Sequence, residues 1–226
     1  MLTARPTAIP YITQREGEVA APDNLLLKPP NARTGRRAGY RLFYADEDPR
    51  LDRDAHLVLW ARVSFNPLDA QRRPTGKPQW KFMHPFRQRF TMEALRCQIC
   101  TDPATTPIGT IFLAGAKDYE STEPPLLTNQ PPVCAKHVRT ATSLCDHLKD
   151  DPVVFLATSA PMYGVMGVLY GLVDGQVQVV AQPPEPLPFR HPNVPTLLAS
   201  QLVRRLSRYR VLTVSELTRE LAAVPT

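Results

Sequence analysis

Short runs of β-branched and aromatic residues recur along the chain and predict strands. They cover residues 39–45, 56–64, 109–114 and 152–158. Two more runs, at 163–170 and 176–180, flank Asp174-Gly175, a pair that favours a two-residue hairpin turn. Glycines inside the first of these two runs indicate bulges or the close approach of another backbone. The pattern as a whole predicts an antiparallel sheet.

Apolar residues at helical spacing predict helices after Cys134 and in the C-terminal region. From Pro195 to Tyr209 the leucines recur every four residues, and Thr213-Val-Ser-Glu216 is a capping box that starts a last helix. Two such helices would also suit a helix-turn-helix, but the glutamates of the last helix would be repelled by a DNA groove. We therefore expect a packed C-terminal helical pair at 195–223.

The first 39 residues differ from the rest of the chain. They are rich in proline and lack a periodic apolar pattern, so they are predicted to form an extended arm with a basic end, Lys28–Arg37. Residues 40–226 are numerous enough to bury one hydrophobic core and are predicted to form a single α+β domain. The 25 prolines of the chain favour extended connections and short strands over a helical bundle.

Four residues in the middle of the chain have the spacing of zinc ligands. Cys97-Gln-Ile-Cys100 and Cys134-Ala-Lys-His137 each separate two ligand residues by two positions, as in tetrahedral sites of three thiolates and one imidazole. We therefore predict that Cys97, Cys100, Cys134 and His137 bind Zn²⁺. Four protein ligands leave no open coordination position, which predicts a structural ion.

The segment around these ligands, residues 96–149, resembles a treble-clef zinc finger, with a knuckle, a strand and a second ligand pair at the start of a helix. The insert between the two pairs is longer than is common in that class. The remaining cysteine, Cys145, lies about 12 Å beyond His137 along the expected helix, which excludes it from the same coordination sphere. It is predicted to be a core thiol.

Positive charge is concentrated in residues 72–96. This stretch holds seven basic residues and one acidic residue, an excess equal to the formal net charge of +6 of the whole chain. Aromatic residues are interleaved with the charges, which suits phosphate contacts and base stacking. The predicted partner-binding residues are Arg72, Arg73, Lys77, Trp80, Lys81, Arg87 and Arg89. Phe82, Phe86 and Phe90, however, also fit the buried face of a helix that opens near Pro85.

Familiar catalytic patterns are missing from the sequence, and no catalytic residues are predicted. Residues 101–133 contain no histidine, which an HNH nuclease would need between its ligand pairs, and the chain lacks the His-x-Glu of zinc deaminases and the Gly-x-Ser-x-Gly elbow of hydrolases. The acidic turn at 46–54 could bind magnesium or serve acid–base chemistry, but its arginines favour a self-paired loop.

The sequence also indicates a cellular compartment. It has no apolar run long enough to cross a bilayer, and its first residues lack the apolar segment of a secretion signal. We therefore expect a cytoplasmic protein. Thiols are kept reduced in that compartment, which favours metal binding over disulfides.

Several short motifs, in this order, resemble a family of uncharacterised actinobacterial proteins. They are Tyr11-Ile-Thr, Asp46-Glu-Asp-Pro-Arg, Leu59-Trp-Ala-Arg, His84-Pro-Phe-Arg-Gln-Arg, Cys97-Gln-Ile-Cys and Pro131-Pro-Val-Cys. The resemblance covers most of the chain and implies a cytosolic protein without implying a reaction. The fourth ligand position in that family is often cysteine, for which His137 is an allowed exchange.

The leading hypothesis from the sequence is a non-enzymatic, zinc-stabilised binding or adaptor protein. Its basic and aromatic face, residues 72–96, would contact nucleic acid or another acidic partner. One alternative is an enzyme or accessory subunit with a cleft between the sheet and the zinc module. The other is an assembly protein that oligomerises through the N-terminal arm.

Overall fold

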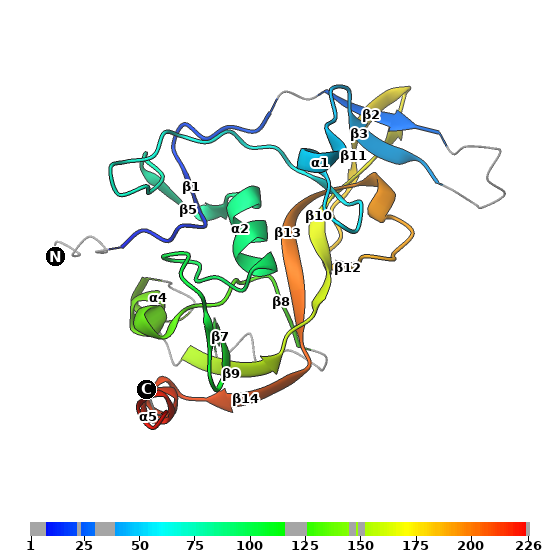
Figure 1. The fold of residues 1–226 in the computed structure, drawn as a ribbon. Coiled ribbons are helices and arrows are strands. Elements are labelled where there is room, and N and C mark those ends of the chain that lie inside the picture. The colour runs from blue at the N-terminus through cyan, green and yellow to red at the C-terminus, as the bar shows by residue number, and fades with distance from the viewer. Residues whose placement is uncertain are drawn as a thin grey trace.

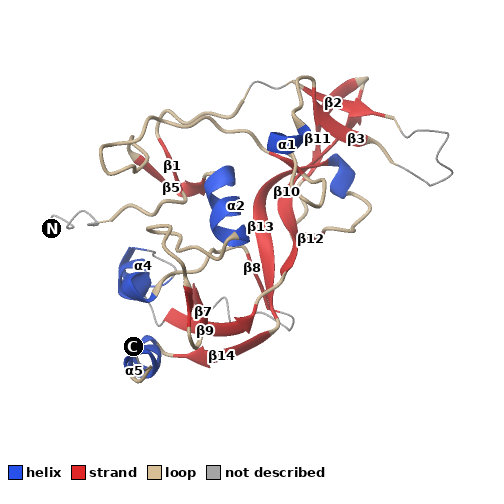
Figure 2. Ribbon diagram, viewed as in Figure 1, coloured by secondary structure: helices blue, strands red, loops and turns tan. Residues whose placement is uncertain are grey.

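The structure is a computed structural model, and it describes residues 8–21, 24–29, 39–115, 126–144, 148 and 152–224. Strands account for 43% of the described residues and helices for 19%, so the fold is mostly β rather than the α+β protein that the sequence predicted (Figures 1 and 2). The helices are α1 (Pro49–Asp52), α2 (Pro85–Glu93), α4 (Val138–Leu144) and α5 (Val214–Ala222), with 3-10 turns η2 (Ala135–His137) and η4 (Val194–Thr196).

Two larger sheets form the body of the molecule. The first has the order β11-β10-β13-β4, with β12 on β10 and β8 on β13; only its β13–β4 pair is parallel. Its strands are β4 (Leu59–Trp60), β8 (Leu126–Thr128), β10 (Met162–Val173), β11 (Gln176–Ala181), β12 (Leu187–Pro188) and β13 (Leu197–Leu206). The second sheet is antiparallel, with the order β14-β9-β7-β6. Its strands are β6 (Thr105–Thr106), β7 (Gly109–Gly115), β9 (Pro152–Ser159) and β14 (Arg208–Leu212).

Two long stretches of chain pass from one sheet into the other. The chain leaves β9 and enters β10 after two residues, and it leaves β13 and enters β14 after one. These stretches pair antiparallel with each other in both sheets, through Met162 opposite Arg204 and Ser159 opposite Arg208. Figure 1 shows the resulting bend, with β10 and β13 above and β9 and β14 below.

The hairpin at Asp174-Gly175 is confirmed. Both residues have positive φ angles, 51° and 78°, as a tight turn between β10 and β11 requires. The predicted close approach of another backbone at the glycines is also confirmed. A Cβ atom at Gly164 would lie 2.0 Å from the carbonyl oxygen of Leu187, and one at Gly167 would lie 2.1 Å from that of Leu198.

The predicted helix from Pro195 to Tyr209 is wrong, because this segment forms β13 and β14. The pairing register shifts so that Ser200 is an extra residue in β13 opposite Met166 and Gly167. A bulge of this kind reverses which residues face inward, so Leu197 and Ala199 before it share the buried side with residues 202, 204 and 206 after it. The resulting spacing imitates a helix. Only the last helix of the predicted pair, α5, is present, and its capping box at Thr213 is confirmed.

Helix α2 packs against β13 through polar side chains. The Gln88 amide donates to the carbonyl of Leu202 and accepts from the N–H of the same residue, at 2.9 Å each. It therefore provides hydrogen-bond partners for the β13 backbone between the residues that pair with β4 and those that pair with β8. From β13, Arg204 donates to the carbonyls of Met92 and Glu93 at the end of α2. Its side chain therefore caps the helix instead of facing solvent.

The described part of the N-terminal arm lies on the body of the protein. Strand β1 (Thr13–Arg15) pairs with β5 (Pro78–Met83), and β2 (Leu25–Lys28) pairs with β3 (Arg41–Tyr44). Residues 30–38 of the predicted basic end, and Cys145, lie outside the described residues. Within the described ranges, no helix combines the length and apolarity that crossing a membrane requires.

Candidate metal centre and nucleic-acid interface

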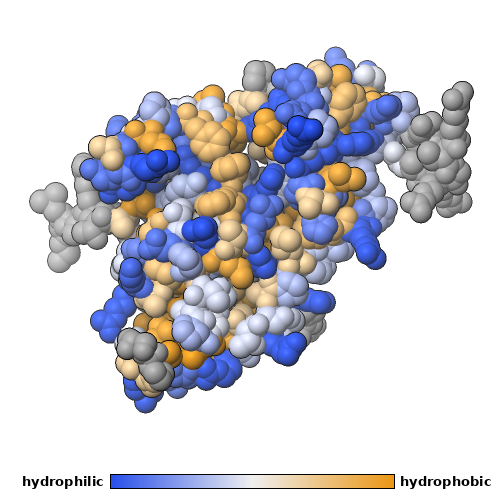
Figure 3. Space-filling model, in the orientation of Figure 1, coloured by the Kyte–Doolittle hydropathy of each residue, from blue (hydrophilic) through white to orange (hydrophobic). Residues whose placement is uncertain are grey.

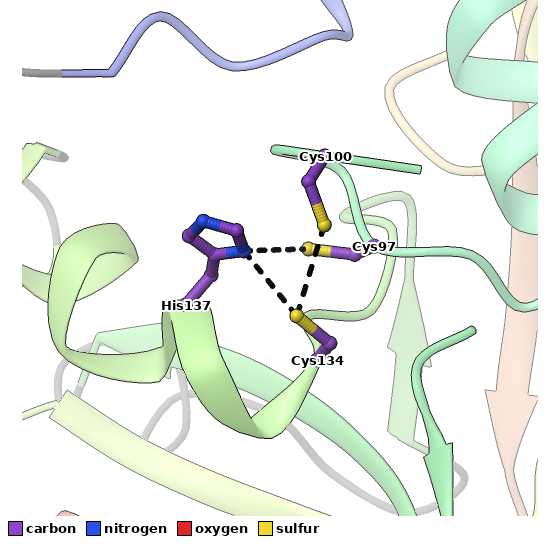
Figure 4. Close-up of side chains that lie close together, drawn as sticks. All are labelled: Cys97, Cys100, Cys134 and His137. Atoms are coloured by element: carbon purple, nitrogen blue, oxygen red, sulfur yellow. Dashed lines mark hydrogen bonds between the residues drawn. The ribbon is translucent and has the colours of Figure 1, made fainter. Parts of the chain in front are cut away.

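The four predicted ligands meet at one point. Cys97, Cys100, Cys134 and His137 place their ligand atoms within 4.8 Å of one another (Figure 4). The Sγ atoms of Cys100 and Cys134 are 3.8 Å apart, and Nδ1 of His137 lies 3.3 Å from Sγ of Cys134 and 3.9 Å from Sγ of Cys97. A tetrahedral zinc ion with ordinary bond lengths separates its sulfur and nitrogen ligands by about 3.6–3.8 Å. The residues therefore fit a metal ion of this kind.

Local backbone structure presents the first ligand pair. After α2 the chain turns so that the N–H of Thr101 donates to the carbonyl of Cys97 at 2.9 Å, and the N–H of Ile99 approaches Sγ of Cys97 at 3.5 Å. Thr101 has a φ angle of 66°, which closes the turn. The N–H of Cys97 donates to the carbonyl of Asp102 at 2.8 Å. Together these bonds place both sulfurs of the Cys-x-x-Cys turn on one side.

The second ligand pair is fastened directly to the first. Gln98 donates from its backbone N–H to Pro132 and from its side chain to Pro131, at 2.9 and 3.0 Å. Val133 donates to the carbonyl of Ile111 on β7 at 2.9 Å. Cys134 then caps the 3-10 turn that carries His137 and leads into α4. The prediction of this pair at a helix start is confirmed.

The protein surroundings alone favour neutral thiols at this centre. Burial raises the pKa of the Cys100 and Cys134 thiols, and the nearby Cys97 raises both further. Three sulfurs so close together would repel one another as thiolates. A bound cation reverses this preference because it deprotonates coordinating thiols.

The basic residues predicted to bind a partner fall into different environments. Arg87 is only 1% exposed, so it does not belong to the surface on which it was placed. Arg73 pairs with Asp69 and Arg89 with Glu93, both at 3.1 Å. Arg72, Lys77 and Lys81 are exposed. Part of the local positive charge is thus neutralised by Asp69 and Glu18, which lie outside residues 72–96, and part by Glu93 within them.

Three aromatic residues of the same stretch are exposed, contrary to the buried stripe that their spacing also allowed, and only Phe90 of that stripe is half-buried, against Tyr11. Trp80, Phe82 and Phe86 are 49%, 59% and 51% exposed, and neighbouring Phe65 is 56% exposed. We call these four residues the aromatic face. Figure 3 shows hydrophobic residues gathered over the region of α2. Phe86 is exposed on α2 because the helix turns other side chains, among them Gln88, toward β13.

A small pocket adjoins the aromatic face. It has a volume of about 140 Å³ and lies between α1, β4 and α2. Leu51, Trp60, Phe65 and Phe86 supply its apolar walls, and Arg62 and Arg89 its positive charge. The predicted acidic turn lies beside it, and Asp46 and Asp52 of that turn both accept hydrogen bonds from Arg62. Only the Arg53–Glu47 pair lies within the turn, so the predicted self-pairing is confirmed in part, and Arg62 from outside the turn supplies the rest.

A buried ionic cluster under the aromatic face was not predicted. Arg87 donates to Glu18, and both are nearly inaccessible to solvent. Arg15 is also buried, and among the described residues its Nε and Nη1 atoms have no hydrogen-bond partner. Burial, followed by the nearby Arg87, lowers the Arg15 pKa to about 10 and also lowers the pKa of His84, whose Nε2 donates to the carbonyl of Ser64. The pairing spans 69 residues, so no local pattern could reveal it.

Comparisons of the chain with protein families, with curated proteins and with solved structures found no match. The resemblance to an actinobacterial family therefore stays a prediction.

Proposed function

We propose that this chain is a zinc-stabilised, non-enzymatic protein that binds single-stranded nucleic acid through its aromatic face. In this proposal the metal is structural and the surrounding segment is a treble-clef-like module. The ligand set supports zinc, because three soft thiolates and one imidazole in tetrahedral arrangement suit that ion. The ligands also lie in a hydrophobic core that includes Ile111, Leu156 and Leu217, so the ion would hold together β7, β9 and α5.

The observation that carries the binding proposal is the exposure of Trp80 and Phe82 on alternate positions of β5. Alternate residues of a strand point to the same side and lie about 6.6 Å apart. The spacing of the two rings is thus roughly twice the 3.4 Å rise between stacked bases. Two neighbouring bases of a single strand can therefore separate from each other, and each can stack on one of the two rings. Lys77 lies just before β5, 3.9 Å from Glu16 and with its side chain 88% exposed, and can exchange this weak surface pair for a phosphate.

Fluorescence anisotropy of a labelled twelve-residue oligothymidylate tests this proposal. Wild-type protein should bind it more tightly than a duplex of equal length. Trp80→Ala and Phe82→Ala should each weaken binding by roughly 1–3 kcal/mol, the usual contribution of a stacked base. Lys77→Gln should lower the salt dependence of binding, because one fewer counterion is released.

The control is Val180→Ala, which alters a residue of similar exposure, 51%, on β11 of the first of the two larger sheets. Equal binding by all of these variants would contradict the proposal. Metal content of the purified protein, measured by elemental analysis, tests the zinc part separately, and one zinc per chain is expected.

A further inference from the structure

The pocket beside α2 is too small for most cofactors and metabolites. Such ligands occupy pockets of roughly 300–1,000 Å³, whereas this one has a volume of about 140 Å³. That volume suits one planar ring system. The rings of Phe65 and Phe86 meet edge to face with centroids 5.3 Å apart, and Trp60 lies in the same wall. The pocket therefore offers flat aromatic surfaces to a single flat group.

One cation at the pocket, Arg89, offers a contact for an anion next to that group, whereas Arg62 is occupied by Asp46 and Asp52. The Asp52 carboxylate is held by Arg62, and its side chain is only 6% exposed. Arg89 lies 5.1 Å from the Trp60 ring centroid and, among the described residues, hydrogen-bonds only through Nε to Glu93. Its two terminal nitrogens are therefore available to a phosphate, which guanidinium groups bind well.

The pocket also continues the surface of β5. Phe86 follows Phe82 by four residues, and His84 between them stacks on Phe65 with centroids 4.6 Å apart. A strand of nucleic acid lying over Trp80 and Phe82 would reach the pocket with its next nucleotides. One nucleotide would then contact both the aromatic rings of the pocket and the terminal guanidinium nitrogens of Arg89.

We infer that this pocket binds one unstacked nucleobase of a single strand, with the adjoining phosphate on Arg89. The inference rests on the proposed function, and it adds a specific subsite to it. Phe65 and Phe86 contact the base, and Arg89 fixes the position of the backbone.

The chain provides its own reporter for this subsite. It has two tryptophans, Trp60 in the pocket wall and Trp80 on the exposed strand. In Trp80→Phe protein all tryptophan emission comes from Trp60, while an aromatic ring is kept on β5. Titration with oligothymidylate should change this emission as the site fills. An oligomer of abasic sugar phosphates, which lacks bases, should leave the emission unchanged.

Two further variants in this background measure the contacts. Phe86→Ala should weaken oligothymidylate binding roughly 5- to 150-fold, the range expected for one stacked base. Arg89→Gln should weaken binding and reduce its salt dependence. Val180→Ala again serves as the matched control, and melting temperatures verify that each variant is folded.

The outcomes separate this inference from the proposed function. If Phe82→Ala weakens binding while Phe86→Ala and Arg89→Gln do not, the pocket inference is overturned and the proposed function stands. If wild-type protein binds no oligonucleotide, both are overturned. If an acidic, leucine-containing peptide changes the Trp60 emission and oligothymidylate does not, the pocket is a protein-binding site and the inference is overturned.

Discussion

The metal centre and the buried ionic cluster hold the same N-terminal segment in two different ways. At the metal centre, Tyr11 and Ile12 donate backbone hydrogen bonds to the carbonyls of Ile99 and Gln98, inside the Cys-x-x-Cys turn. At the ionic cluster, a few residues further along, Glu18 accepts from Arg87 on α2. The first fastening lies at four side chains that could hold a metal ion, and the second depends on charges within the chain.

The difference lies in how charge is balanced. At the candidate metal centre, a dication would offset two of the three negative charges of the thiolates, and the imidazole would add none. The ionic cluster has two buried arginines and one carboxylate, with His84 kept neutral by burial. Burying charges costs several kcal/mol for each ion unless they are paired. The metal centre should therefore dominate stability, and the ionic cluster should be sensitive to single substitutions.

Removal of the metal should have the largest effect. Structural zinc contributes about 10–16 kcal/mol in finger peptides, comparable to the whole stability of a domain. A strong chelator, or Cys97→Ser, should therefore unfold the core around Ile111 and Leu217. Near-ultraviolet circular dichroism during chelation and zinc addition measures this. Cys145→Ala, at a cysteine that the spacing excludes from the ligand set, should lower the melting temperature far less than Cys97→Ser does. An unchanged melting temperature after chelation would show that the cluster holds no stabilising metal.

Substitutions in the ionic cluster should have unequal effects. Glu18→Gln leaves Arg15 and Arg87 buried without a counter-charge, and we expect a loss of about 3–5 kcal/mol in the free energy of unfolding. Arg87→Met should cost less, because Arg15 remains to balance Glu18. Urea denaturation of both variants gives the comparison. Equal losses would mean that Arg15 does not take part in the charge balance.

A change of pH should separate the two regions. Burial depresses the pKa of His84 in the folded state, so the unfolded state binds the proton more readily. The stability that neutral His84 contributes is present above the unfolded pKa, near 6.5, and is lost as pH falls below it. The slope should approach 1.4 kcal/mol per pH unit below that value. His84→Gln should flatten the slope between pH 6.5 and 5, measured by urea denaturation. An identical slope in the wild type and the variant would show that groups other than His84 take up the protons.

The smallest expected effect concerns helix α5, which adds Leu217 to the core around the metal ligands. Thr213 accepts from the N–H of Glu216 at 3.2 Å as the first residue of the capping box. Thr213→Ala should cost about 1 kcal/mol. Thermal melting of the zinc-loaded protein tests this, with Thr218→Ala on the same helix as the control. A much larger loss would show that the capping residue also supports the metal centre.

The sequence predicted features whose information is local. Ligand spacing identified the metal centre, because a Cys-x-x-Cys turn and a helix start each fix two side chains within four residues. The hairpin at Asp174-Gly175 and the capping box at Thr213 could be predicted from the sequence in the same way. In each case a few neighbouring residues determine the geometry.

The features that could not be predicted depend on distant partners. In β13, the bulge at Ser200 produced helical spacing, and only pairing with β10 reveals it. In α2, the buried face is polar because Gln88 bonds to the backbone of β13, 114 residues away. The assignment of Arg87 to a partner-binding surface was wrong for the same reason, because Arg87 is buried against Glu18, which is distant in the sequence. Residue type and spacing carry no information about such pairings.

The position of β13 late in the chain has a consequence for synthesis. This strand pairs with β10, β4 and β8, and all three are made before it. A nascent chain that ended before Leu197 would therefore present unpaired strand edges, which promote aggregation. Shortened forms of the protein that stop before this point should accumulate as insoluble material, even with every metal ligand in place.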